Sequence, residues 1–384
     1  MEYEILKPPP HRHRTVWILV AVLVVAAIGG GAYVFGAHRG ATTTPAHHAT
    51  SPPVTAAHPV SVVATVPATG AKDVPSNQVV TITLSDPVAT VTAVPTFSPI
   101  VAGTWKKSAT STLTFAAAAP FLPTVTETLT IPAGLRTISG ATLGTPTSVT
   151  FAVAQASTER LQQLLAQENY LPLTFTPSNP TTPPADLATA QPGAFAWRWP
   201  GLPPDFTSQW SEGSENVITK AALMSFQNQH GLHVDAIAGP AMWTALLADA
   251  TANKANTQPY VDVLVSKQVP QTLTLYENGA PVMANVPVNT GAPGADTADG
   301  TFPVFEHVTS SRMQGTNPDG STYDDPAVPW ASYFNGGDAL HGFVRASYGT
   351  PQSNGCVEMP IATAAQVWPL TPIGTPVTVI GPPS

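Results

Sequence analysis

The strongest constraint on the fold is a series of short Val- and Thr-rich runs, separated by Pro, Gly and Asn. Four of these runs have the composition of strands: 79–85, 112–115, 126–131 and 148–153. β-Branched residues fit a pleated surface, and short strands at this spacing are typical of an antiparallel β-sandwich. We therefore expect a β-sandwich at 59–154. It carries no catalytic constellation, so its expected role is spacing or docking.

The next part of the chain changes to a helical pattern. Apolar residues recur at helical spacing in three segments: 157–167, 217–230 and 241–250. A Pro-rich stretch that reaches about Gly213 separates the first two segments. We expect a small three-helix domain with a Pro-rich insertion at 155–250.

Strand patterns return from Tyr260 to the end of the chain. They are clearest at 261–265, 272–276, 282–289, 338–343 and 376–380. The segment Glu277-Asn278-Gly279-Ala280 is typical of a hairpin turn. The sequence therefore predicts a multidomain, mainly β fold, with a β-rich domain at 259–381.

The N-terminal region contains an apolar run, 16–35, without a charged side chain. About twenty helical residues span roughly 30 Å, which is enough for a bilayer core. Three basic residues precede the run: Lys7, Arg12 and Arg14. The next twenty residues beyond it offer only Arg39, so the N-terminus is expected in the cytoplasm. We expect a transmembrane anchor at 16–37 after a cytoplasmic tail at 1–15. The alternative is a cleaved signal peptide and a secreted protein.

Composition excludes one class of partner. Only 10% of the residues are charged and the net charge is −8, so the chain lacks the basic surface that nucleic-acid binding requires. Residues 38–58 are rich in Ala, Thr, Pro and His without apolar periodicity, which indicates a disordered linker. His47 and His48 lie in this linker, where isolated histidines are usually only solvated.

Cys356 is the only cysteine, so no disulfide can form within the chain. It follows Ser353-Asn354-Gly355, a run of small or turn-forming residues, and lies fifteen positions after His341-Gly342. A lone cysteine with a distant histidine is a candidate Cys-His nucleophile pair. The alternative is a cysteine that packs as a small hydrophobic residue, with a histidine that only fills space.

An ordered set of motifs supports the interpretation of Cys356 and His341 as a catalytic pair. The set comprises Tyr276 to Gly279, Thr290-Gly291, Asp299-Gly300-Thr301-Phe302, His341-Gly342, Ser353-x-Gly355-Cys356-Val357 and Gly374-Thr375-Pro376-Val377. In this order the motifs resemble the catalytic domain of L,D-transpeptidases, the YkuD-type fold, over residues 259–380.

Two other segments resemble domains of wall-associated proteins. The segment that starts at Pro67-Ala68-Thr69-Gly70 resembles the first strand region of bacterial Ig-like domains. Residues 226–232, the Gly239-Pro240 pair and Trp243 resemble the peptidoglycan-binding three-helix domain, although that family usually has Gly where this chain has Ala236.

The chemistry of amide cleavage assigns roles within the catalytic resemblance. Cys356 is the expected nucleophile, and its thiolate is the reactive species. His341 is the expected proton acceptor and donor, and the family resemblance implies that the backbone carbonyl of Gly342 orients it. The backbone N–H groups of Gly355 and Cys356 are expected to form the oxyanion hole. Asn354 lies beside that hole, and Ser353 is expected to hydrogen-bond within the turn.

Two residues depart from the family pattern. The family usually has His where this chain has Asn354, and Arg or Asn where it has Glu358. Glu358 would place a negative charge near a site that usually offers a cation or an amide to an acidic peptide. The departures predict an altered substrate preference, or an inactive homologue as the alternative.

Residues 304–340 are expected to form a lid over the site. Trp330, Tyr333 and Phe334 are candidate walls for a peptide substrate and flank the turn Asn335-Gly336-Gly337. The alternative is a long loop fixed by its own aromatic residues. The nearby aspartates lack the spacing of a calcium loop, so neither a metal nor a cofactor is assigned.

The resemblance implies an enzyme of peptidoglycan maturation. Cys356 would attack the carbonyl of the third residue of a tetrapeptide stem and release the terminal D-alanine. An amine of a neighbouring stem would capture the thioester as a cross-link, whereas capture by water would make the protein an L,D-carboxypeptidase. Carbapenem-type β-lactams are expected inhibitors. The helical domain could bind wall glycan, and the anchor would place these domains outside the cell membrane, facing the wall. The alternative is an inactive wall-binding protein.

Overall fold

The computed structural model describes residues 59–89, 93–179 and 189–381. The expected anchor at 16–37 lies outside these residues, as do the cytoplasmic tail before it and the linker at 38–58. Within the described ranges, every helix is too short or too polar to cross a bilayer.

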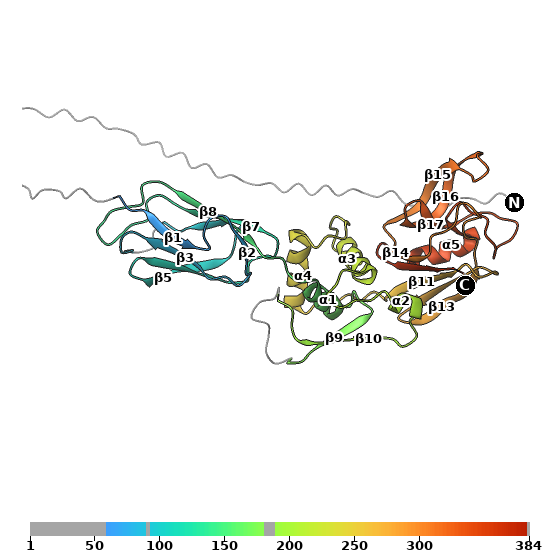
Figure 1. Ribbon diagram of the computed structural model, residues 1–384, viewed down its shortest axis with the longest axis horizontal. Coiled ribbons are helices and arrows are strands. Elements are labelled where there is room, and N and C mark those ends of the chain that lie inside the picture. The colour runs from blue at the N-terminus through green and yellow to red at the C-terminus, as the bar shows by residue number, and fades with distance from the viewer. Residues whose placement is uncertain (1–58, 90–92, 180–188, 382–384) are drawn as a thin grey trace, which may run out of the picture. The chain divides into compact units, whose positions relative to one another are not determined.

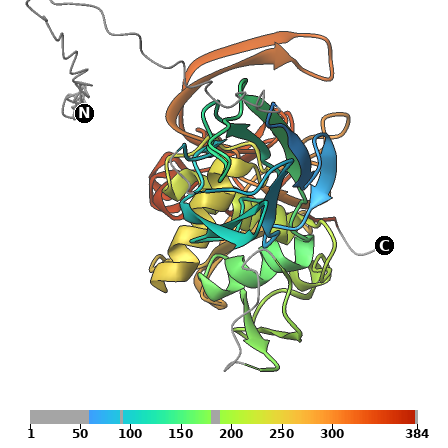
Figure 2. The same cartoon turned by 90° about the vertical axis from the view of Figure 1, so that its left-hand side faces the viewer.

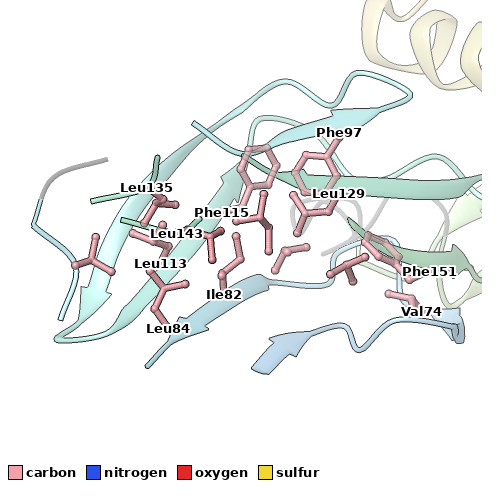
Figure 3. Packing of buried hydrophobic residues seen from close by; sticks show 14 of the residues in the cluster. Val74, Ile82, Leu84, Phe97, Leu113, Phe115, Leu129, Leu135, Leu143 and Phe151 are labelled. Carbon is pink, nitrogen blue, oxygen red and sulfur yellow. The ribbon is translucent and has the colours of Figure 1, made fainter. Parts of the chain in front are cut away.

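The first domain consists of two four-stranded sheets. One sheet has the order β1 (Val62–Val66), β3 (Val80–Leu84), β6 (Thr112–Ala117) and β5 (Gly103–Ala109). The other has the order β2 (Ala71–Val74), β8 (Thr147–Val153), β7 (Thr126–Ile131) and β4 (Thr96–Ser98). Alternate residues of the strands point into the space between the sheets, where Ile82, Leu113 and Leu129 are fully buried (Figure 3). The expected sandwich is present, with one difference: β2 pairs with β8 in parallel.

The second domain contains three main helices: α1 (Thr158–Gln167), α3 (Val217–Gln229) and α4 (Pro240–Ala252). Ser157 and Asn216 cap the first two helices through their side chains, and Pro240 starts the third. The Pro-rich segment between α1 and α3 contains an antiparallel pair, β9 (Leu173–Pro177) and β10 (Gly193–Trp197), and a short helix, α2 (Pro204–Thr207). Sequence patterning gave no indication of this strand pair.

Ala236 occupies the turn where the peptidoglycan-binding domains that this segment resembles usually have glycine. Its φ of 58° is left-handed, a conformation that costs an alanine energy and a glycine almost none. The side chain of Gln227 stabilises this turn, because its Oε1 accepts a hydrogen bond from the Ala236 amide at 3.0 Å. The turn is therefore kept despite the missing glycine.

The third domain contains two sheets around a common apolar core. The five-stranded sheet has the order β13 (Ala280–Pro287), β12 (Thr272–Glu277), β11 (Val261–Ser266), β19 (Pro376–Ile380) and β14 (Gly300–Pro303). The four-stranded sheet has the order β15 (Glu306–Thr316), β16 (Thr322–Asn335), β17 (Asp338–Gly342) and β18 (Val357–Met359). Helix α5 (Ile361–Val367) and the short helix η1 (Trp368–Leu370) follow β18.

The segment expected to be a lid loop is instead strand structure. β15 and β16 form a long antiparallel hairpin that projects from the domain, drawn in orange in Figure 1 and Figure 2. A strand alternates its side chains between two faces, whereas a loop has no such rule. This alternation determines which of the expected lid aromatics can face the site.

Candidate active site

Two neighbouring parallel strands bring His341 and Cys356 to one cavity. His341 lies near the end of β17, and Cys356 immediately precedes β18, whose Val357 pairs with Leu340. The cavity has a volume of about 660 Å³. Besides the histidine and the cysteine it is lined by polar and charged residues of the hairpin, of β17 and β18 and of the loops, among them Arg312, Asn317, Tyr323, Asp325, Tyr333, Asp338, Arg345, Asn354 and Glu358.

His341 is buried and held by its own backbone neighbour. Its Nδ1 lies 3.2 Å from the carbonyl oxygen of Gly342, the contact that the family resemblance implies. A carbonyl can only accept, so Nδ1 carries the proton and Nε2 of the neutral ring is left as an acceptor. Burial lowers the pKa of His341, and the hydrogen bond to Gly342 opposes that shift. The ring is therefore a neutral base near neutral pH.

The thiol of Cys356 is half-buried and protonated in this environment. Its Sγ donates to the carbonyl oxygen of Gly337 at 3.6 Å. Burial raises the pKa of Cys356 to about 12, the negative charges of Asp338 and Glu358 add to the rise, and the backbone N–H of Ala339 opposes it. A thiol with this pKa needs a base before it can attack.

The turn before Cys356 is fixed by a network of short hydrogen bonds. Ser353 Oγ donates to the carbonyl oxygen of Cys356 at 2.6 Å and accepts from the Gly355 amide at 3.2 Å. Thr297 Oγ1 donates to the Gly355 carbonyl at 2.6 Å and accepts from the Gly291 amide at 2.9 Å. These contacts tie the Thr290-Gly291 motif to the turn.

Of the two backbone N–H groups expected to form the oxyanion hole, only one is free of another hydrogen bond among the described residues. The Gly355 amide is already bonded to Ser353 Oγ, within the turn itself. The Cys356 amide has no hydrogen-bond partner among the described residues. Of the two backbone groups, Cys356 N–H is thus the one available to a negatively charged oxygen.

The side chain of Asn354 makes its hydrogen bond elsewhere and not at the expected oxyanion hole. It is exposed, and its Nδ2 donates to Oδ1 of Asn317 at 2.6 Å. Asn317 lies in the turn between β15 and β16. The residue that replaces the usual histidine therefore fastens the tip of the hairpin to the cysteine turn.

Glu358 does not present a free negative charge, contrary to the expectation. Its two carboxylate oxygens each lie 2.7 Å from a nitrogen of Arg345, in a bidentate ion pair. The Glu358 side chain is 5% exposed and that of Arg345 is 30% exposed. The pair presents its cationic side to solvent, which corrects the charge that the sequence suggested for this position.

Only one of the three expected wall aromatics lines the cavity. Tyr333 does, and its hydroxyl is 2.7 Å from that of Ser311. Phe334 is the next residue of β16, so it points to the other face and is 3% exposed in the core. Trp330 packs against the core and against Trp368, with ring centroids 5.5 Å apart. Phe334 and Trp330 are therefore structural and not substrate walls.

Sequence reasoning missed Asp338 and Arg345. Asp338 begins β17 and packs against Gly355, and burial raises the pKa of Asp338 to about 6. In the sequence, the only indication of a role for Asp338 is that it is a charged residue three positions before the candidate base His341. Arg345 could have been found as a possible counterion once Glu358 had been judged unusual. Among the described residues, no group of three or more His, Cys, Asp or Glu is arranged to hold a metal ion.

Comparisons with protein families agree with the three structural domains. Residues 259–379 match the family of L,D-transpeptidase catalytic domains, the YkuD family. Residues 56–153 match the bacterial Ig-like domain, and residues 211–246 match a peptidoglycan-binding domain. No curated protein resembles the chain closely enough to be reported as a relative.

Several solved structures that are similar to the chain are L,D-transpeptidases. An L,D-transpeptidase from Mycobacterium smegmatis is 14% identical over 84% of this chain and 100% of its own, with a TM-score of 0.30. L,D-transpeptidase 3 from Mycobacterium tuberculosis, in complex with a faropenem-derived adduct, is 14% identical over 83% of this chain and 97% of its own, with a TM-score of 0.29.

The catalytic domain of an E. faecium L,D-transpeptidase is 23% identical over 33% of this chain and 100% of its own, with a TM-score of 0.29. The family matches cover the three domains separately. Residues 259–379 thus match the L,D-transpeptidase catalytic domain family, residues 56–153 match the bacterial Ig-like domain, and residues 211–246 match a peptidoglycan-binding domain.

Proposed function

We propose that the protein is an active L,D-transpeptidase that cross-links peptidoglycan through a thioester on Cys356. The observation that carries the proposal is the shared cavity of Cys356 and His341, in which Nδ1 of the histidine is committed to Gly342. A base with one nitrogen fixed and the other free as an acceptor suits proton transfer from a protonated thiol.

The first half-reaction starts from a neutral pair. His341 Nε2 removes the proton of Cys356 Sγ as the sulfur attacks the carbonyl carbon of the third residue of a tetrapeptide stem. The developing oxyanion accepts a hydrogen bond from the Cys356 amide. The imidazolium then returns the proton to the nitrogen of the departing D-alanine, the C–N bond breaks, and a thioester remains.

The second half-reaction reverses the proton path. The side-chain amine of a diamino acid on a neighbouring stem attacks the thioester, and His341 accepts its proton. The C–S bond breaks, the sulfur recovers a proton from the imidazolium, and the new amide is the cross-link. Attack by water gives a shortened stem and no cross-link, which is the carboxypeptidase outcome.

The accessory segments fit this reaction as a stalk. We propose that residues 16–37 anchor the chain in the cell membrane and that the later domains face the wall. The peptidoglycan-binding domain would hold glycan near the catalytic domain. Carbapenem-type β-lactams offer a strained amide to the same thiol and are the proposed inhibitors.

Intact mass spectrometry after incubation with a carbapenem tests the proposal. The wild-type chain should gain the mass of one carbapenem, and Cys356→Ser should gain none. Incubation with tetrapeptide stems should release D-alanine, and the ratio of dimer to tripeptide separates cross-linking from carboxypeptidase action. A wild-type protein that gains no adduct and releases no D-alanine would be an inactive homologue.

A further inference from the structure

Arg345 is held more firmly than a surface arginine. Its Nε and Nη2 are both bonded to Glu358, and Nη2 also donates to the carbonyl oxygen of Gln352 at 3.3 Å. The guanidinium lies over the ring of Phe343, with 4.7 Å between its carbon and the ring centroid. The side chain therefore has a fixed plane and a fixed position.

The backbone of Arg345 is fixed as well. Its amide donates to the hydroxyl of Tyr348 at 3.2 Å, and that hydroxyl donates to the carbonyl oxygen of Phe343. The Phe343 amide in turn donates to the carbonyl oxygen of Met359, at the end of β18, at 2.9 Å. The loop that carries Arg345 is thus joined to the strand that follows Cys356.

One nitrogen of this fixed group is left without a partner. Nη1 of Arg345 has no hydrogen bond among the described residues, and Arg345 lines the cavity of Cys356 and His341. Because Glu358 pairs with His341 across the parallel strands, the ion pair lies directly beside the candidate base. A fixed, half-exposed guanidinium with free N–H donors is a binding group for a carboxylate.

We propose that Arg345, oriented by Glu358, binds a carboxylate of the stem peptide and makes the enzyme prefer acidic over amidated stems. This rests on the proposed transpeptidase function. A tetrapeptide stem offers such a group in two places near the reacting carbonyl. One is the C-terminal carboxylate of the departing D-alanine, and the other is the side-chain carboxylate of a diaminopimelate residue at position three.

Binding measurements test the preference without relying on turnover. The full chain carrying Cys356→Ser is titrated by calorimetry with three tetrapeptides: the free acid with diaminopimelate, the same peptide with a C-terminal carboxamide, and the free acid with lysine at position three. Loss of one charge-assisted hydrogen bond should weaken binding about 10- to 100-fold. The peptide that loses affinity identifies the carboxylate that Arg345 holds.

Variants of Arg345 link the preference to this residue. Added to Cys356→Ser, Arg345→Gln should bind all three peptides with the same weak affinity, and Arg345→Lys should recover only part of the difference. Arg312→Gln is the matched control, because Arg312 also lines the cavity but its ion pair with Asp324 is exposed. That variant should keep the wild-type preference.

Three outcomes would overturn the inference. Equal affinity of the parent for all three peptides would do so, as would a preference that survives in Arg345→Gln or disappears in Arg312→Gln. Because Arg345→Gln could disturb folding, the comparison of the three peptides on the parent protein stands alone. Carbapenem acylation of the wild-type thiol is read separately, so a failure of catalysis is not confused with a failure of this binding site.

Discussion

Oδ1 of Asp338 occupies the space that a side chain on Gly355 would need. Gly355 has a φ of 114°, which lies in the region that only glycine adopts without strain. The residue before the cysteine is therefore glycine for two reasons at once: its backbone conformation and its contact with an acidic neighbour.

Gly355→Ala should combine both penalties. We expect it to destabilise the protein by about 1–3 kcal/mol and to reduce carbapenem acylation strongly. Gly336→Ala is the matched control, because Gly336 has a φ of 54° but no atom near its missing side chain. Thermal unfolding and intact mass separate the two effects. Equal losses in both variants would mean that the contact with Asp338 contributes nothing.

The pH dependence of acylation should report the neutral starting pair. Burial lowers the pKa of His341 and raises that of Cys356 to about 12. In the wild type, the acylation rate should therefore rise through the lowered pKa of His341 and then stay flat across neutral pH. In His341→Ala the rate should be suppressed near pH 7 and climb about tenfold per pH unit in alkaline solution, as the thiolate forms unaided. Parallel profiles for the two proteins would remove His341 from the proposed role.

Asp338→Asn should make the thiol more acidic. The negative charge of Asp338 is one of the causes that hold the pKa of Cys356 high, after burial. Without it the pKa should fall, and alkylation by iodoacetamide at alkaline pH should accelerate. Asp324→Asn, on the exposed ion pair of the hairpin, should leave alkylation unchanged. An unchanged rate in Asp338→Asn would show that the charge of Asp338 does not contribute to the raised pKa of Cys356.

Asp262 should make the fold less stable as pH rises. It is 1% exposed in β11, its Oδ1 has no partner among the described residues, and burial raises its pKa from 3.8 to about 7. The folded state then binds a proton that the unfolded state has already lost, so this group's contribution to stability declines between about pH 4 and pH 7. Asp262→Asn should remove that decline. The test is the difference in melting temperature between the two proteins across this range, which should grow with pH.

Local periodicity was sufficient for much of the fold. Strands such as β11 and β12 were predictable because their apolar residues alternate, and the ordered motifs indicated Cys356 and His341 without any structure. The β15–β16 hairpin was missed because β15 is mostly polar on both faces and because two prolines, Pro326 and Pro329, interrupt the strand pattern of β16. Without the strand there was no basis for separating Tyr333, which lines the cavity, from Phe334, which does not.

Contacts between residues that are far apart in the sequence limited how much of the site could be predicted. Glu358 looked like an unpaired charge because Arg345 is thirteen residues away and meets it only when β18 pairs with β17. Asn354 likewise contacts Asn317, thirty-seven residues away, at 2.6 Å. Neither contact leaves a spacing or a periodicity in the sequence.

The hydrogen bond between Asn354 and Asn317 joins the tip of the β15–β16 hairpin to the turn that carries Cys356, thirty-seven residues further along the chain. A movement of the hairpin tip away from the site would have to break this bond. Asn354 therefore couples the position of the hairpin to that of the nucleophile.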